Sequence, residues 1–381
     1  MTKILLKENL NEFNDAIVRV RYSKPMNLLC KKGYELLEKG HKKVDVLIHP
    51  FMRPSGEYFL SNLVKTKYLI LDIYDVYYGE EKEILPTQIC RIVKEKADLI
   101  TVTTDEIKKS LLEYFGEECI KDRVRVIEDP YYFEPVEPFF SPGSILKIGW
   151  FGGGINFNKK FWSKILDDLF LKKKAFKGKG VERIQIRFFS NIKEEDFIES
   201  TNSFVELKNL EFSFERLKDF VRSNDVIMIP TYPNSKYFNA KSHNRIVDTL
   251  MLGVPAIASP ISSYKPFCKF TPIDEDLVNA LLGLLGKKQK DIEKDIVSAQ
   301  KYIKDNFSPE LIASKWISII EEVVKDIDKK KYRILVKLSL IEYLNHVSSK
   351  IKIMIGKIIG KNLTLKVQRI KRHFRKATAK E

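Results

Sequence analysis

The sequence has few of the features that mark secreted, metal-binding or membrane-spanning proteins. It has only four cysteines, without a Cys-x-x-Cys pair, so neither a disulfide framework nor a zinc site is expected. The first residues, MTKILLKENLNEF, show no apolar core followed by a small-residue cleavage site. No segment reaches the roughly 18 uninterrupted apolar residues of a spanning helix. We therefore expect reduced thiols in a chain that is neither secreted nor membrane-spanning.

Positive charge is abundant, but it is concentrated at the C-terminus. The 381 residues carry a formal net charge of +16. Residues 329–381 contain 16 Lys or Arg against Glu342 and Glu381, which gives +14 and leaves about +2 for residues 1–328. The whole chain is 44% apolar, and its nearly neutral part is long enough for two globular domains.

Short apolar segments alternate with amphipathic ones before residue 130. Strands are predicted at 44–48, 68–74, 98–102 and 124–128, and helices at 26–39, 56–65, 83–96 and 105–115. This order requires right-handed crossovers between parallel strands, so residues 1–142 are predicted to form a Rossmann-like α/β domain. The proline-rich segment 131–144 stops regular structure, and we interpret it as the linker to a second domain.

The alternation begins again after the linker. Strands are predicted at 145–151, 183–189, 225–229 and 254–259, with amphipathic segments at 158–170, at 215–223 and from 241. Residues 143–308 are therefore predicted to form a second Rossmann-like α/β domain. Ser308 suits an N-cap and Pro309 the first helical turn, so 309–328 is predicted to be a closing helix. Parallel sheets bind ligands at their carboxyl ends, which predicts a site in an interdomain cleft.

The segment 225–260 is the most informative. If 241–252 is helical, Lys241, Arg245 and Asp248 lie within about 60° of one another, because successive residues are ~100° apart. Gly253 would end this helix and Pro255 would prevent its continuation. The opposite, apolar side would pack on the sheet and consists of Ile246, Val247, Leu250 and Met251.

This pattern suits a nucleotide diphosphate. A helix start offers free N–H groups and a partial positive charge, to which Lys241 and Arg245 add full cations. Asp248 can accept hydrogen bonds from ribose hydroxyls, as acids do in other nucleotide-binding α/β domains. The alternative is a solvated helix surface, on which one Lys and one Arg are common.

The same segment resembles the donor-site region of GT-B glycosyltransferases, in the group related to glycosyltransferase family 4. The matching residues, in order, are Lys241, Ser242, Asn244, Arg245, Asp248, Gly253, Val254 and Pro255. The resemblance implies that the basic positions neutralise the donor diphosphate and that Asp248 replaces a ribose-binding glutamate. Many relatives carry another glutamate eight positions earlier, where Ala240 stands. Weaker matches in the expected order, VDVLIHP, LDIYDVYY, ADLITVTTDEIKKSL and KIGWFGGG, extend the resemblance over about 300 residues.

Other candidate residues lie at predicted strand ends. Gly152 and Gly153 either approach the donor phosphates or only turn a strand into a helix. His49 either contacts the donor sugar or is a structural histidine. Asp72 and Asp75 either supply a general base for an inverting transfer or orient loops, which we favour. His243 points about 100° or more from Arg245, so we do not predict it to be catalytic.

The basic C-terminal segment predicts an amphipathic helical tail over 334–376. Leu344, Ile351, Ile358 and Leu365 recur at sevenfold spacing among many lysines and arginines. Such a helix can lie on an anionic membrane surface, and the alternative is packing on this protein or on a partner. Nucleic-acid binding is less favoured, because the segment has few aromatic residues.

The sequence thus predicts an α/β protein of two Rossmann-like domains in tandem, the GT-B fold, with a basic tail at 329–381. The predicted activity is sugar transfer from a nucleoside-diphosphate sugar to a hydroxyl of a glycan or lipid-linked acceptor, at the cytoplasmic membrane face. Lys241, Arg245 and His49 are the predicted catalytic residues. No cofactor or metal is expected, because electrostatic stabilisation of the leaving phosphate can suffice. The alternatives are a non-catalytic sugar-nucleotide-binding protein recruited by its tail, or a GT-B-like epimerase.

Overall fold

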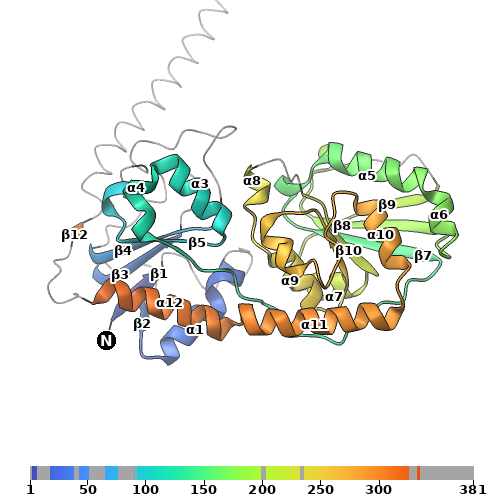
Figure 1. Cartoon of the computed structure of the whole chain (residues 1–381). Helices are drawn as coiled ribbons and strands as arrows, with labels where there is room; N and C mark the ends of the chain where they lie inside the picture. Colours follow the sequence, from blue (N-terminus) through green and yellow to red (C-terminus); the bar gives the residue numbers. More distant parts are fainter. Residues whose placement is uncertain are drawn as a thin grey trace, which may run out of the picture.

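The computed structural model describes residues 2–6, 18–37, 43–50, 65–75, 90, 92–198, 203–231, 236–325 and 333–334. These residues form two parallel α/β domains joined by an extended linker (Figure 1). The predicted helix at 56–65 lies outside the described residues except for Lys65, and the predicted tail helix lies outside them except for Ile334.

The first sheet is parallel except for one short strand. Its order is β2-β1-β3-β4-β5-β6, and β12 pairs antiparallel with β4. The four strands predicted here are confirmed, whereas the short β1 and β2 were missed. β12 lies within the segment predicted as tail, so that segment begins as part of the first sheet. The strands are β1 (Lys3–Leu6), β2 (Glu35–Leu37), β3 (Lys43–Pro50), β4 (Lys65–Ile73), β5 (Leu99–Val102), β6 (Val124–Val126) and β12 (Arg333–Ile334).

Glycines with positive φ follow two helices of the first domain. The helix predicted at 26–39 is too long, because Gly33 turns the chain with φ of 90° and β2 follows. The helix predicted at 105–115 is confirmed: the Thr104 hydroxyl caps its start by accepting from the Ile107 N–H, and Gly116 ends it with φ of 87°. The helical segments are η1 (Val18–Ser23), α1 (Lys24–Lys31), η2 (Ile92–Lys96), α3 (Asp105–Phe115), α4 (Glu117–Ile120) and η3 (Lys121–Arg123).

The second sheet is fully parallel, in the order β11-β10-β7-β8-β9. The four predicted strands are confirmed as β7 (Ile145–Phe151), β8 (Arg183–Ser190), β10 (Val226–Ile229) and β11 (Ala256–Ala258). The edge strand β9 (Val205–Glu211) was missed because most of its side chains are polar and at least partly exposed. The helices are α5 (Lys159–Leu171), α6 (Lys173–Lys177), α7 (Leu217–Arg222), α8 (Lys236–Asn239), α9 (Asn244–Met251), α10 (Leu277–Leu285) and α11 (Gln289–Phe307), with short turns η4 (Gly154–Asn156), η5 (Glu194–Asp196) and η6 (Ser262–Phe267).

The closing helix α12 (Pro309–Val324) follows the second domain but packs on the first (Figure 1). Trp316 is fully buried, and its ring centroid lies 6.3 Å from that of Tyr22. Two ion pairs add to this contact, Lys315 with Glu128 at 2.5 Å and Arg125 with Glu322 at 2.6 Å. The Ser308 hydroxyl caps the helix by accepting from the Leu311 N–H, as its sequence predicted.

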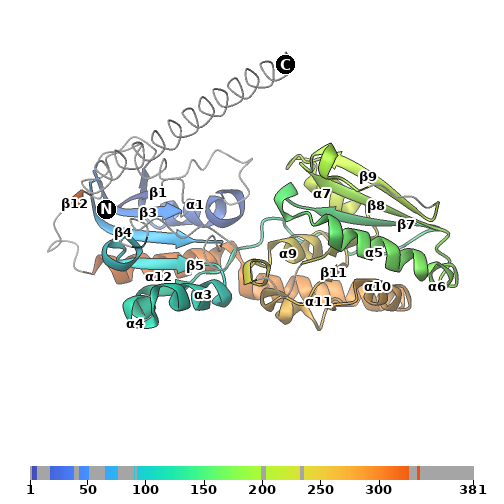
Figure 2. The same cartoon turned by 90° about the horizontal axis from the view of Figure 1, so that it is seen from above.

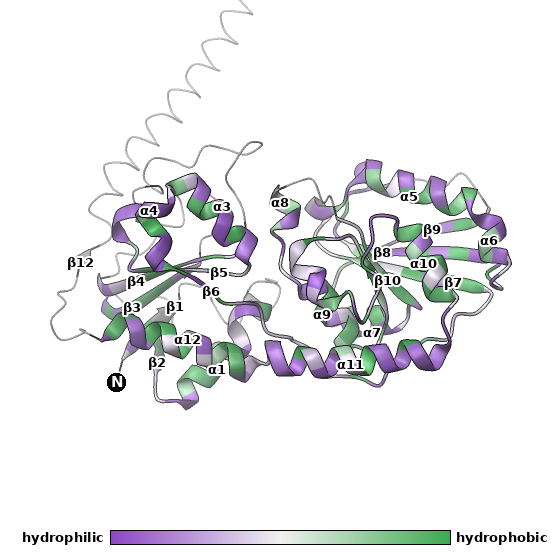
Figure 3. Ribbon diagram, viewed as in Figure 1, coloured by the Kyte–Doolittle hydropathy of each residue, from purple (hydrophilic) through white to green (hydrophobic). Residues whose placement is uncertain are grey.

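Apolar residues lie mainly on the strands and on the inward sides of the helices (Figure 3). The second domain has one large core cluster, and the first has one cluster on each side of its sheet. α12 supplies much of one of those two clusters. Within the described residues, no helix is both long and apolar enough to cross a membrane.

Candidate functional site

The carboxyl ends of the two sheets point toward the domain junction. In Figure 2 the arrowheads of β3, β4 and β5 face those of β7, β8 and β9. β3 ends at His49 and Pro50, and β7 is followed by Gly152. This arrangement places the ends at which parallel sheets bind ligands on both sides of one junction.

The helix predicted at 241–252 begins later than expected. α9 starts at Asn244, where the Val247 N–H donates to the His243 carbonyl, and Lys241 instead closes the turn after α8. The prediction that Lys241, Arg245 and Asp248 share one helix face is therefore wrong for Lys241. The rest of the pattern is confirmed: Gly253 ends α9 with φ of 75°, and the apolar side is buried through Ile246, Val247, Leu250 and Met251.

Lys241 connects the two domains. Its amine lies 2.7 Å from Asp75 Oδ2, just beyond the end of β4, and 2.6 Å from the Tyr237 hydroxyl. The Tyr237 hydroxyl also donates to Asp75 at 3.4 Å. Asp75 is thus engaged by the second domain, so in this state it holds Lys241 rather than acting as a free base.

Arg245 lies beside the glycine turn. Its Nη1 is 3.8 Å from the position that a Cβ on Gly152 would occupy. Nη1 is buried and has no hydrogen-bond partner among the described residues. Burial raises the pKa of the nearby Tyr264 hydroxyl, and the positive charge of Arg245 partly offsets this rise. The Tyr264 hydroxyl and Arg245 Nη1 do not form a hydrogen bond with each other. A buried N–H without a partner costs free energy, which an anionic ligand can recover.

The glycine turn brings backbone close to this arginine. Gly152 has φ of 153°, and its carbonyl accepts from the Ser190 hydroxyl at 2.6 Å. A Cβ on Gly154 would lie 2.9 Å from the Asn191 carbonyl oxygen, so a larger residue does not fit there. Gly153 is exposed, and the turn leads into η4. The run therefore turns the strand and places Gly152 next to Arg245, whereas its approach to the donor phosphates stays a prediction.

Asp129, just before the linker, contacts both domains and was missed. Its Oδ1 accepts from Arg21 at 3.0 Å, and its Oδ2 accepts from the Asn244 side chain at 2.8 Å. Its carbonyl lies 3.1 Å from His243 Nε2. Asn244, predicted to bind the donor, therefore holds the domain junction in this structure. The only sequence signal was an Asp-Pro pair after a predicted strand.

Asp72 is the centre of a buried network in the first domain. Its carboxylate accepts two bonds from Arg21, each at 2.5 Å, one from Thr101 at 2.6 Å, and one from the Tyr22 hydroxyl. Burial works against the Arg21 charge, but Asp72 and Asp129 raise the pKa of Arg21 above its ordinary value. With these partners Asp72 is a structural residue, which agrees with the favoured alternative.

The remaining predicted residues lie in the expected region. His49 is 4% exposed at the carboxyl end of β3. Ser242 is half-buried in the turn between α8 and α9, and Asp248 is 8% exposed on α9. Their roles in sugar, phosphate and ribose binding stay predictions.

Ala240 lies where many resembling proteins carry a glutamate, and it belongs to the domain contact. It is 2% exposed and packs with the core of the first domain. Its carbonyl accepts from the Thr104 hydroxyl at 3.1 Å. A carboxylate here would be desolvated, so this position serves packing in this chain.

Two further polar groups lie near the strand ends and gave no sequence signal. Asn156 Oδ1, after the glycine turn, and Thr231 Oγ1, after β10, are buried without hydrogen-bond partners among the described residues. Both residues line one cavity of about 10 Å³. They add acceptors and a donor that a ligand at this end of the sheet can engage.

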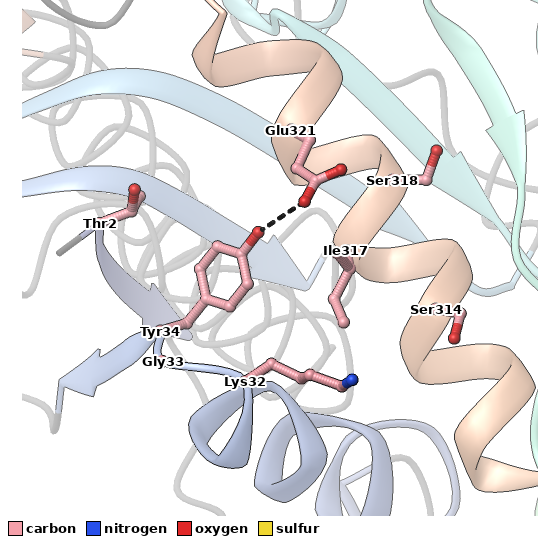
Figure 4. A pocket seen from close by; sticks show the side chains of 8 residues that line it. All are labelled: Thr2, Lys32, Gly33, Tyr34, Ser314, Ile317, Ser318 and Glu321. Atoms are coloured by element: carbon pink, nitrogen blue, oxygen red, sulfur yellow. Dashed lines mark hydrogen bonds between the residues drawn. The ribbon is translucent and has the colours of Figure 1, made fainter.

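A larger pocket lies away from the junction, between α12 and the turn after α1 (Figure 4). It has a volume of about 570 Å³, and the Tyr34 hydroxyl donates across it to Glu321 at 3.5 Å. Thr2, which precedes β1, lines it, so it lies at the amino end of the sheet. Parallel sheets bind ligands at the other end, and we assign this pocket no role in the site.

No group of three or more His, Cys, Asp and Glu is placed to hold a metal ion in the described part of the chain. Asp274 and Asp276 have the spacing of paired metal-binding carboxylates. However, Asp276 caps α10 by accepting from the Asn279 N–H, and it pairs with Lys172 at 3.2 Å. These carboxylates therefore have structural partners.

Burial lowers the pKa of His243, and the neighbouring Asp129 only partly offsets this. The folded protein therefore holds this ring neutral at a pH where the unfolded chain, with an ordinary pKa of about 6.5, begins to bind a proton. The free energy of unfolding should fall as pH drops below about 6.5. In His243→Gln this fall should be smaller between pH ~7.5 and ~5.5, as measured by urea denaturation. Parallel curves for the two proteins would contradict this role.

Comparison with known proteins finds solved structures of similar fold. No protein-family model matches the chain, and no curated protein matches it. Two parallel α/β domains with facing carboxyl ends and a final helix that returns to the first domain define the GT-B fold, which confirms the two-domain part of the predicted fold class. The chain is similar to the solved structure of Anabaena Alr3699/HepE in complex with UDP and glucose, with a TM-score of 0.55 and 12% identity over 84% of this chain and 100% of that one.

Two further solved structures are similar over most of the chain. One is described as trehalose-6-phosphate from E. coli bound with UDP-2-fluoro glucose, with a TM-score of 0.53, 12% identity, and coverage of 77% of this chain and 75% of that one. The other is alpha,alpha-trehalose 6-phosphate synthase from Burkholderia multivorans, with a TM-score of 0.51, 9% identity, and coverage of 74% and 72%. At these identities the likeness concerns the fold.

Proposed function

We propose that this chain is a glycosyltransferase that binds a nucleoside-diphosphate sugar in its second domain and transfers the sugar to an acceptor hydroxyl held mainly by the first. The observation that carries the proposal is the buried Arg245 Nη1, which has no hydrogen-bond partner among the described residues and lies beside the Gly152 turn. Similar structures with UDP and glucose, or with UDP-2-fluoro glucose, support this ligand class.

In this mechanism negative charge develops on the departing diphosphate. Arg245 and the start of α9, which has no side-chain cap, stabilise that charge, and no metal is needed. Lys241 contributes once the diphosphate competes with Asp75 for its amine. The sugar acceptor would enter from the side of His49 and the other strand ends of the first domain.

The test of activity is the release of free nucleoside diphosphate from a panel of nucleotide sugars, with and without EDTA. A transferase releases the diphosphate in the presence of acceptor, and EDTA leaves the rate unchanged. Binding without release would favour the non-catalytic alternative, which the packing role of Ala240 supports. Release together with an isomerised free sugar would favour an epimerase.

The ion pair of Lys241 with Asp75 predicts opposite effects of two substitutions. Lys241→Ala should weaken nucleoside-diphosphate binding by about 1 to 3 kcal/mol, because it removes a charge-assisted hydrogen bond. Asp75→Asn should strengthen binding several-fold, because the diphosphate no longer competes with a carboxylate. Calorimetric titration with UDP measures both. If Asp75→Asn weakens binding as much as Lys241→Ala does, the two residues act together on the ligand. The proposal that the diphosphate competes with Asp75 for the Lys241 amine is then wrong.

The acceptor is proposed to be a glycan or lipid-linked molecule at the cytoplasmic membrane face, with the basic segment as anchor. Removing residues 335–381 keeps β12 and should strongly reduce the salt-sensitive part of binding to anionic vesicles while leaving UDP binding intact. Vesicle co-sedimentation at low and high salt measures the first effect, and calorimetry the second. Unfolding of the shortened chain would instead show that the segment belongs to the fold.

A further inference from the structure

Two neighbouring apolar side chains are exposed at the end of α5. Phe170 is 49% exposed and Leu171 is 77% exposed. Leu171 is the most exposed large hydrophobic side chain in the described part of the chain. α6, which follows directly, lies at the end of the second domain opposite the junction in both Figure 1 and Figure 2. An exposed apolar pair at such an end has no role in the donor site.

Lysines surround this pair. The segments 170–180 and 286–290 contain eight lysines and no acid. The two segments are neighbours in space, because Lys179 Nζ lies 3.0 Å from the position of a Cβ on Gly286. Together with Phe170 and Leu171 they form what we call the distal lysine surface, whose lysines are Lys172, Lys173, Lys174, Lys177, Lys179, Lys287, Lys288 and Lys290.

Most of this charge is not neutralised locally. Three of the lysines pair with acids outside the two segments: Lys172 with Asp276, Lys177 with Glu182, and Lys287 with Asp295. The other five form no ion pair with the described residues, and Lys173 lies 5.6 Å from the ring centroid of Phe204. The surface therefore keeps an excess of positive charge around an exposed leucine.

We propose that the distal lysine surface is a contact site for anionic lipid headgroups. Lysines attract the headgroup phosphates, and an apolar side chain beside them can enter the boundary between headgroups and acyl chains. A nucleic acid or acidic glycan would satisfy the lysines but leave Leu171 in water. Single-stranded nucleic acid also favours several aromatic platforms along the strand, and Phe170 is the one exposed aromatic side chain in the segments 170–180 and 286–290.

The contact adds a second point of attachment to the predicted tail. β12, from which the chain continues into residues 335–381, lies at the far side of the first domain from α6 (Figure 1). Contacts at both ends orient the long axis of the molecule parallel to the bilayer, and the domain junction then lies between the two contacts. This inference does not depend on the proposed transfer activity, and it can fail or hold separately.

The test uses a tryptophan introduced into the distal lysine surface of the full-length chain. Trp150, Trp162 and Trp316 are all buried, so they are shielded from lipid-borne quenchers. In Leu171→Trp, fluorescence should be quenched by vesicles of brominated phosphatidylcholine that contain about a third phosphatidylglycerol. The matched control is Leu311→Trp, since Leu311 is a 37% exposed leucine on α12. Its fluorescence should not change when the protein binds the same vesicles.

A charge reversal supplies the second readout. Lys174→Glu should reduce the partition onto anionic vesicles about tenfold, because it removes one attractive charge and adds a repulsive one. Lys304→Glu, an exposed lysine near the end of α11, should leave partition nearly unchanged. Three results would overturn the proposal: an unquenched Leu171→Trp protein on vesicles to which it co-sediments, equal effects of the two charge reversals, or no vesicle binding at all.

Discussion

Replacing Arg245 with alanine is expected to weaken nucleoside-diphosphate binding by about 1.5 to 3 kcal/mol, or roughly 10- to 150-fold in Kd. The reason is that Arg245 Nη1 is buried beside Gly152 without a hydrogen-bond partner among the described residues, so this N–H can donate to an anion. Calorimetric titration with UDP measures the loss. Arg183→Ala is the control, because Arg183 is exposed at the opposite end of the second sheet.

The same substitution separates binding from folding. An unpartnered buried N–H costs the free protein stability, so Arg245→Ala should unfold at an equal or higher urea concentration than the parent protein. A variant that loses both affinity and stability would indicate that Arg245 supports the fold. Unchanged affinity in a stable variant would remove Arg245 from the donor site.

Replacing Asp72 with asparagine is expected to cost about 3 to 5 kcal/mol of the free energy of unfolding, the usual result of breaking a buried ion pair from one side. Arg21 would keep a full charge in a site that is 1% exposed, with Asp129 as its remaining acid. Urea denaturation measures the loss. Glu118→Gln breaks an exposed pair with Lys121 at 3.1 Å and should cost about 1 kcal/mol or less.

This second result also decides the role of Asp72. If Asp72→Asn keeps the parent stability but abolishes sugar transfer, the carboxylate is a general base and the structural assignment is wrong. Loss of stability with residual transfer in the remaining folded protein agrees with the buried network.

The sequence predicted those features that depend on local periodicity. The apolar stripe of α9, its end at Gly253 and the cap of α12 at Ser308 all follow from spacing and turn chemistry within a few residues. The same is true of the parallel direction of the strands, because alternating strands and helices favour parallel sheets. These local rules were enough to predict two parallel α/β domains.

The sequence could not predict the pairings that join distant residues. Lys241 meets an acid 166 positions away, so its spacing from Arg245 gave no sign that its amine would cross to the first domain. Arg21 finds its acids 51 and 108 positions later. Such partners depend on how the sheets face each other, and one sequence carries no direct record of that arrangement. The start of α9 was misplaced for a related reason, because the turn after α8 fixes Lys241 outside the helix.

The most direct test of the central claim is a crystal structure of this chain with UDP. Our account predicts diphosphate oxygens within about 3 Å of Arg245 Nη1 and next to the Gly152 turn, with the ribose on the side of Asp248. It also predicts that Lys241 has moved from Asp75 toward the phosphates. A diphosphate bound elsewhere, with Arg245 Nη1 still unpartnered, would contradict the assignment of the donor site.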